Sequence, residues 1–287
     1  MTTTRIATVI PAYNAAASIE AAIASAREQT IPPAEIIVVD DGSTDATARL
    51  AGAAGVRVIQ QANAGPGAAR NRGIAATDAE WIALLDADDS WRPERIAHQL
   101  ERIGEPRVAV IFSGQHFVEK QPPMPPPTID FEGLWERNRI PTSSVLLRRA
   151  AWESVGGFDE SRELIGVEDY NLWLRMAHAG WQFVGIPERL VNYQPSASSL
   201  TRQSQRFAVA EVAQLRQIAT TLGLDAARVH AKEYTTYLQY GMELFYYGER
   251  TAAKQFLSEA ARRGSLPPKA RLQLWATHLP LARWRRP

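Results

Sequence analysis

The sequence contains no cysteine among its 287 residues. Disulfide bridges and cysteine-ligated zinc sites are therefore excluded, and the composition is compatible with a reducing compartment. The chain also lacks a strong net charge, because 32 Lys and Arg residues offset 31 Asp and Glu residues to leave +1 at pH 7. A nearly neutral chain offers no overall attraction for polyanions, so we expect no nucleic-acid partner.

Long hydrophobic runs are missing as well. No window of the sequence approaches the roughly 18 apolar residues of a membrane-spanning helix. The segment from Met1 to Ile10 has neither the apolar stretch nor the cleavage site of a signal peptide. We therefore expect a cytoplasmic protein that meets a membrane peripherally, at its inner face, if at all.

Short apolar runs alternate with helical patterns through the first part of the chain. We predict strands at 5–10, 36–39, 56–59 and 81–85, and helices between them at 15–29, 46–54 and 66–76. This alternation indicates an α/β fold with a mainly parallel sheet flanked by helices. Further strands are predicted at 108–113, 143–147 and 182–186, and a further helix at 168–179.

The strand patterns stop after about Arg202, where a C-terminal helical region begins. Helices are predicted at 207–222, 225–247 and 249–263, and the polar stretch 196–205 marks the boundary before them. We divide the chain into residues 1–105, 106–203 and 204–287, the first two being halves of one α/β domain.

The apolar run WIALL is followed by Asp86, Asp88 and Asp89. Open α/β sheets bind ligands at this carboxyl edge. In an extended backbone Asp86 and Asp88 would project to the same side, and two hard oxygen ligands suit a divalent cation that also holds phosphate. The alternative is a solvated strand-to-helix turn, in which Asp89 or Ser90 caps a helix beginning near Pro93.

Several motifs occur in a fixed order: VIPAYNAAASIEAAIAS, EIIVVDDGSTDAT, NAGPGAARNRGI and WIALLDADD, then IPTSSVLLRR, GGFDE and GVEDYNLWLRMA. Over about residues 5–200 the chain resembles the family-2 glycosyltransferases. The resemblance implies the Rossmann-like GT-A fold and an inverting, metal-dependent enzyme. Such an enzyme moves a sugar from a nucleotide-diphosphate sugar to a hydroxyl acceptor, typically in bacterial polysaccharide, O-antigen or glycolipid biosynthesis of the cell envelope.

The resemblance also implies a donor site and its partners. We expect a UDP-sugar first among nucleotide-sugar donors, a saccharide or lipid-linked saccharide acceptor, and Mn²⁺ or Mg²⁺ as cofactor. In the DXD motif, Asp86 is implied to contact the ribose and Asp88 to bind the metal, while Asp89 shares the metal or caps a helix. The implied nucleotide-sugar-binding residues are Pro11, Tyr13, Asn14, Asp41, Asn63, Gly65, Arg70, Asp86, Ala87 and Asp88.

Three residues of these motifs also have a structural interpretation. Tyr13 could instead be a core aromatic residue, and Arg70 with Arg72 could form a solvated helix face. For Asp45, which lies in the second motif, we favour a helix N-cap over a role in binding.

On the acceptor side, Asp169 matches the family's general base, and Glu168 would orient the acceptor or Asp169. The alternative is an ordinary acidic first turn of a helix, which the helix dipole favours. Trp152 either stacks on an acceptor sugar or packs in the core. Some relatives have a further histidine ligand after this helix, but Tyr193–Ser196 contains none, so the metal shell is incomplete.

The C-terminal region lies outside the resemblance. Most aromatic residues of 234–247 should pack between helices. For 272–286 we favour a packed helix with a frayed basic end over a membrane-surface segment that inserts Leu274, Trp275, Leu279 and Trp284. This helical tail is also a candidate surface for a homodimer.

Two other functions are compatible with carboxylates at a sheet edge. A nucleotidyltransferase would need a Gly-rich, Lys-bearing loop after the first strand, and PAYNAAAS has neither feature. The second is a non-catalytic sugar- or nucleotide-binding module. The substitution Asp169→Asn separates it from an enzyme, in which turnover should be lost while donor binding survives.

Overall fold

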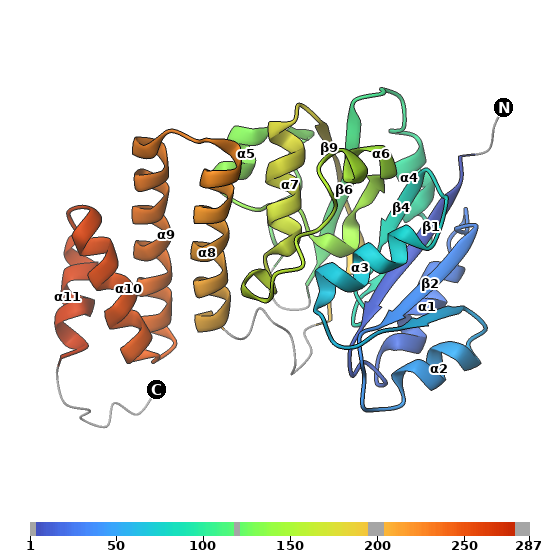
Figure 1. Cartoon of the computed structure of the whole chain (residues 1–287), viewed down its shortest axis with the longest axis horizontal. Coiled ribbons are helices and arrows are strands. Elements are labelled where there is room, and N and C mark those ends of the chain that lie inside the picture. Colours follow the sequence, from blue (N-terminus) through green and yellow to red (C-terminus); the bar gives the residue numbers. More distant parts are fainter. Residues whose placement is uncertain (1–3, 118–120, 195–203, 279–287) are drawn as a thin grey trace. The chain divides into compact units, whose positions relative to one another are not determined.

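The computed structural model describes residues 4–117, 121–194 and 204–278 (Figure 1). The chain divides into two compact units, Met1–Ser199 and Leu200–Pro287. Unit 1 contains the sheet, and unit 2 contains helices. The further division of the first part at residue 105 runs through one continuous sheet and stays a prediction.

Four parallel strands form one side of the unit 1 sheet, as the sequence predicted. They lie in the order β3 (Arg57–Gln60), β2 (Glu35–Asp40), β1 (Ile6–Ala12) and β4 (Trp81–Leu84). Each neighbouring pair is parallel. Their carboxyl ends therefore meet at one edge, which brings the segments after β1, β2 and β4 together.

The other side of the sheet is mixed in direction. β8 (Leu146–Arg148) is antiparallel to both β4 and β6 (Val108–His116), and β9 (Gln182–Asn192) is parallel to β6. β5 (Ser90–Trp91) and β7 (Thr128–Ile129) pair antiparallel with β9. Because β8 runs against β4, the residues that precede β8 lie at the edge where β4 ends.

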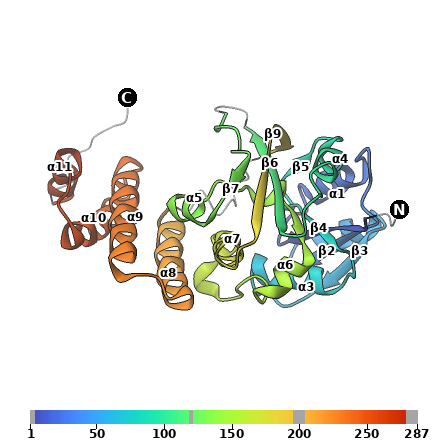
Figure 2. The ribbon, with the colours of Figure 1, turned by 90° about the horizontal axis from the view of Figure 1, so that it is seen from above.

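Helices cover both faces of this sheet, with α1 and α4 on one side and α3 and α6 on the other (Figure 2). In β2, Val38 belongs to the core cluster of α1, whereas Ile37 and Val39 pack with Ala69 of α3. This alternation explains the continuous apolar run in a strand buried on both faces. The helices of unit 1 are α1 (Ile19–Arg27), α2 (Thr47–Ala53), α3 (Pro66–Ala75), α4 (Arg95–Leu100), α5 (Phe131–Glu136), α6 (Arg149–Ser154) and α7 (Glu168–His178), with 3₁₀ turns η1 (Thr142–Ser144) and η2 (Arg162–Leu164).

Two glycines set the position of α3. A Cβ atom at Gly73 would lie 2.5 Å from a methyl group of Val9, so the helix rests directly on β1. A Cβ atom at Gly67 would lie 2.8 Å from the carbonyl oxygen of Asp159. Close approach on both sides places α3 between the parallel strands and the segment leading to α7.

The segment after the aspartates differs from its prediction. Ser90 and Trp91 form β5, and α4 begins only at Arg95, with Glu94 at its N-cap. Neither Asp89 nor Ser90 caps that helix, because pairing with β9 holds the segment in the sheet. The strand predicted at 143–147 also starts later, since its first residues belong to η1.

Unit 2 consists of helices in the described residues, as predicted. They are α8 (Ser204–Leu222), α9 (Ala226–Tyr246), α10 (Arg250–Arg263) and α11 (Pro268–Ala276). Tyr237 and Tyr240 of α9 are buried in their shared core with Phe256 of α10. Tyr246 and Tyr247 are exposed at the end of α9, so the expected packing holds only for its earlier part.

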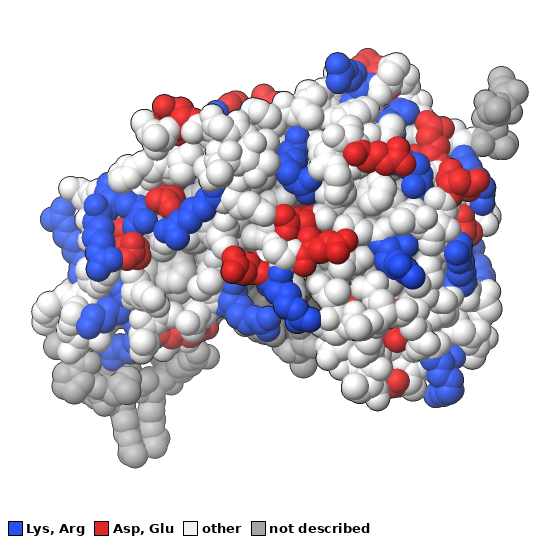
Figure 3. Space-filling model, in the orientation of Figure 1, with Lys and Arg blue, Asp and Glu red and all other residues white. Residues whose placement is uncertain are grey.

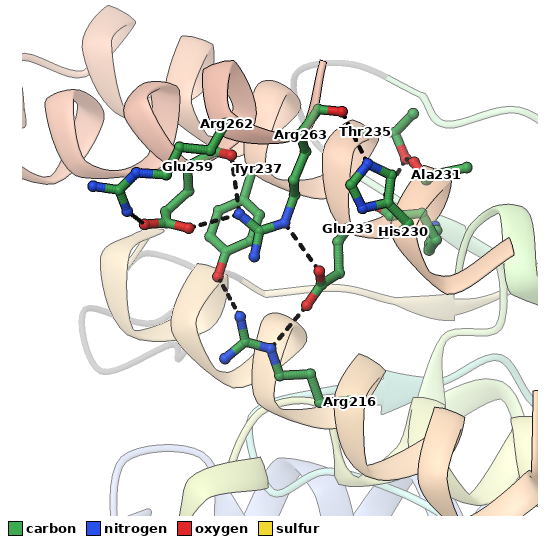
Figure 4. Close-up of polar contacts among 10 residues, drawn as sticks. Arg216, His230, Ala231, Glu233, Thr235, Tyr237, Glu259, Arg262 and Arg263 are labelled. Atoms are coloured by element: carbon green, nitrogen blue, oxygen red, sulfur yellow. Dashed lines mark hydrogen bonds and ion pairs between the residues drawn. The ribbon is translucent and has the colours of Figure 1, made fainter. Parts of the chain in front are cut away.

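Charged side chains join three of these helices (Figure 4). Glu233 of α9 accepts hydrogen bonds from Nε of Arg216 at 2.8 Å and Nε of Arg263 at 2.9 Å. Arg263 also donates to Glu259 at 2.6 Å and lies over the ring of Tyr237. Burial opposes ionisation of Glu233, but the two guanidinium groups outweigh it and lower the pKa of Glu233. The network therefore stabilises the packing of α8, α9 and α10.

Positive and negative side chains are interspersed over the face drawn in Figure 3, in keeping with the near-zero net charge. Within the described ranges, no helix is both long enough and apolar enough to cross a bilayer. In α11, Leu274 packs against the core of unit 2, while Leu272 and Trp275 are exposed. Leu279 and Trp284, which would be inserted if this segment lay at a membrane surface, lie outside the described residues.

Candidate active site

The aspartates after β4 lie in a turn. The strand ends at Leu84, and the Asp89 N–H donates to the carbonyl oxygen of Asp86 at 3.1 Å. The expectation of an extended backbone at Asp86 and Asp88 is therefore wrong, because the chain turns at Ala87 and Asp88. Both carboxylates are nevertheless half-buried at the carboxyl edge of the sheet, and Ala87 between them is buried.

Arg70 of α3 joins two carboxylates from distant parts of the chain. Its Nη2 donates to Oδ1 of Asp86 at 2.7 Å, and its Nη1 donates to Oε1 of Glu168 at 2.5 Å. Burial disfavours the charged guanidinium, but Asp86 and Glu168 outweigh it and raise the pKa of Arg70. With 4% exposure Arg70 is not on a solvated helix face; only Arg72 is exposed.

Asp169 lies beside this pair at the first turn of α7. Its Oδ2 accepts from Oγ1 of Thr142 at 2.5 Å, and its Oδ1 accepts from the Tyr170 N–H at 2.6 Å. Burial and then the charge of Glu168 raise the pKa of Asp169 to about 6, while Thr142 and Arg70 oppose the rise. A carboxylate that ionises just below neutral pH is suited to accept a proton from a hydroxyl group.

The carboxylate of Asp41 organises the loop after β3. It accepts from the N–H groups of Ala64 and Gly65 and from Nε2 of Gln61, each at 2.8 Å. Asn63 adds a hydrogen bond from Nδ2 to the Asp41 carbonyl oxygen. Asp41 is buried, and its side-chain contacts are with this loop. These contacts hold the loop at the N-terminal end of α3.

The residues after β1 lie at the same edge. Tyr13 is 53% exposed, so the alternative of a core aromatic residue is wrong. Asn14 has a φ of 49°, and its Oδ1 accepts from the Thr44 N–H at 2.8 Å, which ties this segment to the loop after β2. Pro11 is buried within β1. An exposed tyrosine ring on a fixed backbone is suited to pack against a flat ligand.

Asp45 does not occupy the N-cap position predicted for it. Ala46 precedes α2 as the N-cap, and the Asp45 carboxylate accepts from the N–H groups of Thr47 at 2.9 Å and Ala16 at 3.1 Å. It therefore links the start of α2 to the segment before α1.

The indole of Trp152 is engaged by α3. Its Nε1 donates to Oδ1 of Asn71 at 3.1 Å, and the Phe158 N–H donates to the same oxygen at 2.9 Å. Nδ2 of Asn71 donates back to the Phe158 carbonyl oxygen. Trp152 is half-buried in this clamp, and its role at an acceptor stays a prediction.

Two hydroxyl residues of η1 were not identified from the sequence. Thr142 contacts Asp169, and Ser143 accepts from the Asp86 N–H at 3.1 Å and donates to Oδ2 of Asp89 at 2.6 Å. The hydroxyl residues directly before the apolar run of β8 are visible in the sequence. They can be assigned to the site only if β8 is known to be antiparallel to β4, because that direction brings the start of β8 to the carboxyl edge of β4.

The aspartates differ in their fitness to hold a metal ion. Asp89 accepts from Ser143 and from the Gln194 N–H, and burial and then the charge of Asp86 raise the pKa of Asp89 to about 8. Asp89 is thereby engaged by Ser143 and Gln194, whereas Asp86 and Asp88 are more exposed. Over the described residues, no group of three His, Cys, Asp or Glu could hold a metal. The half-buried Asp86 and Asp88 fit a cation whose other ligands are phosphate oxygens and water.

The chain is similar to two described protein families and to several known proteins. The family described as "Glycosyl transferase family 2" matches residues 8–156, and "Glycosyl transferase family group 2" matches residues 131–260. The amylovoran biosynthesis glycosyltransferase AmsB of Erwinia amylovora is 31% identical over 209 residues, which are 64% of this chain and 68% of AmsB. The succinoglycan biosynthesis protein ExoO of Rhizobium meliloti is 48% identical over 98 residues, 33% of this chain and 28% of ExoO.

Solved structures share the fold. A mannosyltransferase from Pyrobaculum calidifontis, in complex with GDP-Man and Mn²⁺, matches with a TM-score of 0.65 and 20% identity, over 95% of this chain and 79% of that one. TarS of S. aureus, in complex with UDP-GlcNAc, matches with a TM-score of 0.64 and 18% identity, over 96% and 89%. The expected GT-A architecture is thereby confirmed. Because its family match spans more than half of the chain and AmsB is aligned over two thirds of its own length, this protein belongs to glycosyl transferase family 2.

Proposed function

We propose that the chain transfers a sugar from a nucleotide-diphosphate sugar to a hydroxyl acceptor with inversion at the anomeric carbon. The observation that carries this proposal is the pair of hydrogen bonds from Arg70 to Asp86 and Glu168. One buried guanidinium joins the DXD turn to the first turn of α7, directly beside Asp169. These contacts support one site for the proposed donor-side and acceptor-side residues.

In the proposed reaction, Asp169 acts as the general base. The acceptor oxygen attacks the anomeric carbon while its proton passes to the carboxylate of Asp169. The bond between that carbon and the diphosphate oxygen breaks, and the nucleoside diphosphate leaves with the bonding electrons. Glu168 is held by Arg70 and by the Gly166 N–H at 2.7 Å, which supports a role in orienting Asp169.

The donor would lie along the carboxyl edge of β1, β2 and β4. Tyr13 would pack beside the base, the loop shaped by Asp41 would follow the nucleotide, and Asp86 would meet the ribose. Asp88 would hold Mn²⁺ or Mg²⁺, and the cation would supply positive charge next to the diphosphate. The P. calidifontis enzyme, which shares the fold, is bound to GDP-Man and Mn²⁺, in line with a nucleotide-sugar donor and a divalent cation for this chain.

The relatives support a setting in bacterial polysaccharide assembly. AmsB is described as an amylovoran biosynthesis glycosyltransferase, and TuaG of Bacillus subtilis, 25% identical over 215 residues, as a putative teichuronic acid biosynthesis glycosyltransferase. WfaP of Escherichia coli, 30% identical over 184 residues, is described as a glucosyltransferase that uses UDP-Glc and a diphosphoundecaprenol-linked acceptor. We propose a related donor and a saccharide or lipid-linked saccharide acceptor for this chain.

Thermal unfolding with UDP, GDP and dTDP, each with Mn²⁺ or EDTA, tests the donor site. A nucleotide at a hundred times its dissociation constant should stabilise the folded protein by about 2.7 kcal/mol. We expect one nucleotide to do so with Mn²⁺ only, and Asp88→Asn to lose the effect. Asp78→Asn is the matched control, because Asp78 is 78% exposed and precedes β4 at its other end. No stabilisation of the wild-type protein by any nucleotide would refute the donor site.

A further inference from the structure

The 3₁₀ turn η1 contacts carboxylates on both sides of the site. Thr142 donates to Oδ2 of Asp169 at 2.5 Å, and the neighbouring Ser143 donates to Oδ2 of Asp89 at 2.6 Å while accepting from the Asp86 N–H. Ser143 is buried and Thr142 is half-buried. The turn itself is fixed, because the Val145 carbonyl oxygen accepts from the Leu84 N–H at 3.0 Å at the end of β4.

We propose that Thr142 is a positioning residue for the base Asp169, an inference that rests on the proposed function. The carboxylate has two oxygens, and one of them must present a lone pair to the acceptor hydroxyl. The Tyr170 N–H and the Thr142 hydroxyl fix the rotation of the carboxylate from opposite oxygens. Without Thr142, only the backbone of α7 itself would orient the group.

A hydroxyl group is suited to this position through the whole reaction. It donates to the ionised carboxylate, and it can rotate to accept a hydrogen bond once Asp169 has taken the proton, because a hydroxyl has both a donor and acceptor lone pairs. A backbone N–H or an ammonium group can only donate, so it could not accept a hydrogen bond from the protonated acid. Thr142 therefore keeps a partner for Asp169 before and after proton transfer.

The charged groups around Asp169 have opposite effects on its ionisation. Burial and the neighbouring Glu168 favour the neutral acid, whereas the Thr142 hydroxyl and Arg70 favour the carboxylate. A hydrogen bond to a charged group corresponds to a shift of about one pH unit or more in its titration. Removing the hydroxyl should therefore move the ionisation of Asp169 to higher pH.

The test compares three substitutions within the same turn. Thr142→Val removes the hydroxyl at nearly constant shape, and Thr142→Ser retains it. Ser144→Ala is the matched control, because the Ser144 hydroxyl donates to the Pro141 carbonyl oxygen within the turn. The first readout is the ¹³C titration of the Asp169 carboxyl in the free full-length protein, with its signal assigned by Asp169→Asn.

We expect a titration midpoint near pH 6 for the wild-type protein, Thr142→Ser and Ser144→Ala, from the pKa of about 6 of Asp169. For Thr142→Val we expect the midpoint to rise by about one pH unit. An unchanged midpoint in Thr142→Val would overturn the proposal. So would an equal rise in Ser144→Ala, because the effect would then belong to the integrity of the turn.

The second readout separates this proposal from the function on which it rests. Hydrolysis of UDP-glucose, UDP-GlcNAc or GDP-mannose uses water as acceptor and needs the same base. In Thr142→Val, the rate with the best of these donors should fall about fivefold at pH 6 and little at pH 8.5, as a one-unit shift requires. If Asp169→Asn hydrolyses the donor at the wild-type rate, the base assignment fails and Thr142 with it. If Asp169→Asn is inactive and Thr142→Val keeps the wild-type pH profile, only the role of Thr142 fails.

Discussion

Replacing Arg70 with methionine should destabilise unit 1 strongly. The substitution keeps most of the apolar side-chain volume but leaves Glu168, with only 7% of its side chain exposed, without its guanidinium partner. Removing one partner of a buried ion pair typically costs about 3–5 kcal/mol. Asp86, whose side chain is 33% exposed, can regain water and should add little. We therefore expect the free energy of unfolding of unit 1 to fall by ~3 kcal/mol or more.

The double variant Arg70→Met with Glu168→Gln tests the cause of that loss. Glutamine removes the buried charge while its amide can still accept from the Gly166 N–H. Replacing both members of a buried pair is often nearly neutral, so the double variant should recover most of the lost stability. Arg139→Met is the control, because the exposed pair of Arg139 with Glu136 should contribute at most about 1 kcal/mol.

Amide hydrogen exchange of β1 and β4 is the appropriate assay, since it measures the opening of unit 1 without assuming that both units unfold together. A loss below ~1 kcal/mol in Arg70→Met would refute the argument from burial. A double variant as unstable as Arg70→Met would show that the loss comes from packing around the guanidinium rather than from the unpaired charge of Glu168.

Two further predictions concern the ionisation of Asp169 and the packing of α3 at Gly67. Burial and Glu168 raise the pKa of Asp169 to about 6, and the base must be ionised, so donor hydrolysis should rise as pH increases through about 6 and level off above it. A pH–rate profile without this limb would contradict the assignment. A methyl group at Gly67 would lie 2.8 Å from the Asp159 carbonyl oxygen, so Gly67→Ala should destabilise unit 1 by about 1–3 kcal/mol. Gly52→Ala, in open space on α2, should stabilise by about 0.5–1 kcal/mol, and hydrogen exchange measures both; equal effects would mean that α3 does not need its close approach.

The parallel part of the fold could be predicted because its signals are local. Each apolar run from β1 to β4 is followed by turn residues and a helical pattern, and parallel pairing places all the carboxyl ends at one edge. The positions of Tyr13, Asp41 and Asp86 at that edge followed from the sequence for this reason. Their proposed contacts with a donor came from the family resemblance and stay predictions.

The features of the fold and the site that could not be predicted depend on contacts between segments far apart in the chain. The direction of β8 is set by its neighbours β4 and β6, and no residue within it distinguishes the two directions. Thr142 and Ser143 could therefore not be assigned to the site. Asp89 was left open between metal and cap because its actual partner, Ser143, is 54 residues away in the chain. Arg70 likewise meets Glu168 at a separation of 98 residues.

Adjacent side chains of α3 hold the segment of unit 1 that runs from Trp152 to Glu168. Arg70 pairs with Glu168, and Asn71 binds Trp152 and both backbone groups of Phe158. A chimera between family members would have to preserve these contacts. A transplanted segment would pack correctly only with a carboxylate at position 168 and a loop that matches Asn71. Exchange of this segment between family members is thus constrained by two neighbouring positions on α3.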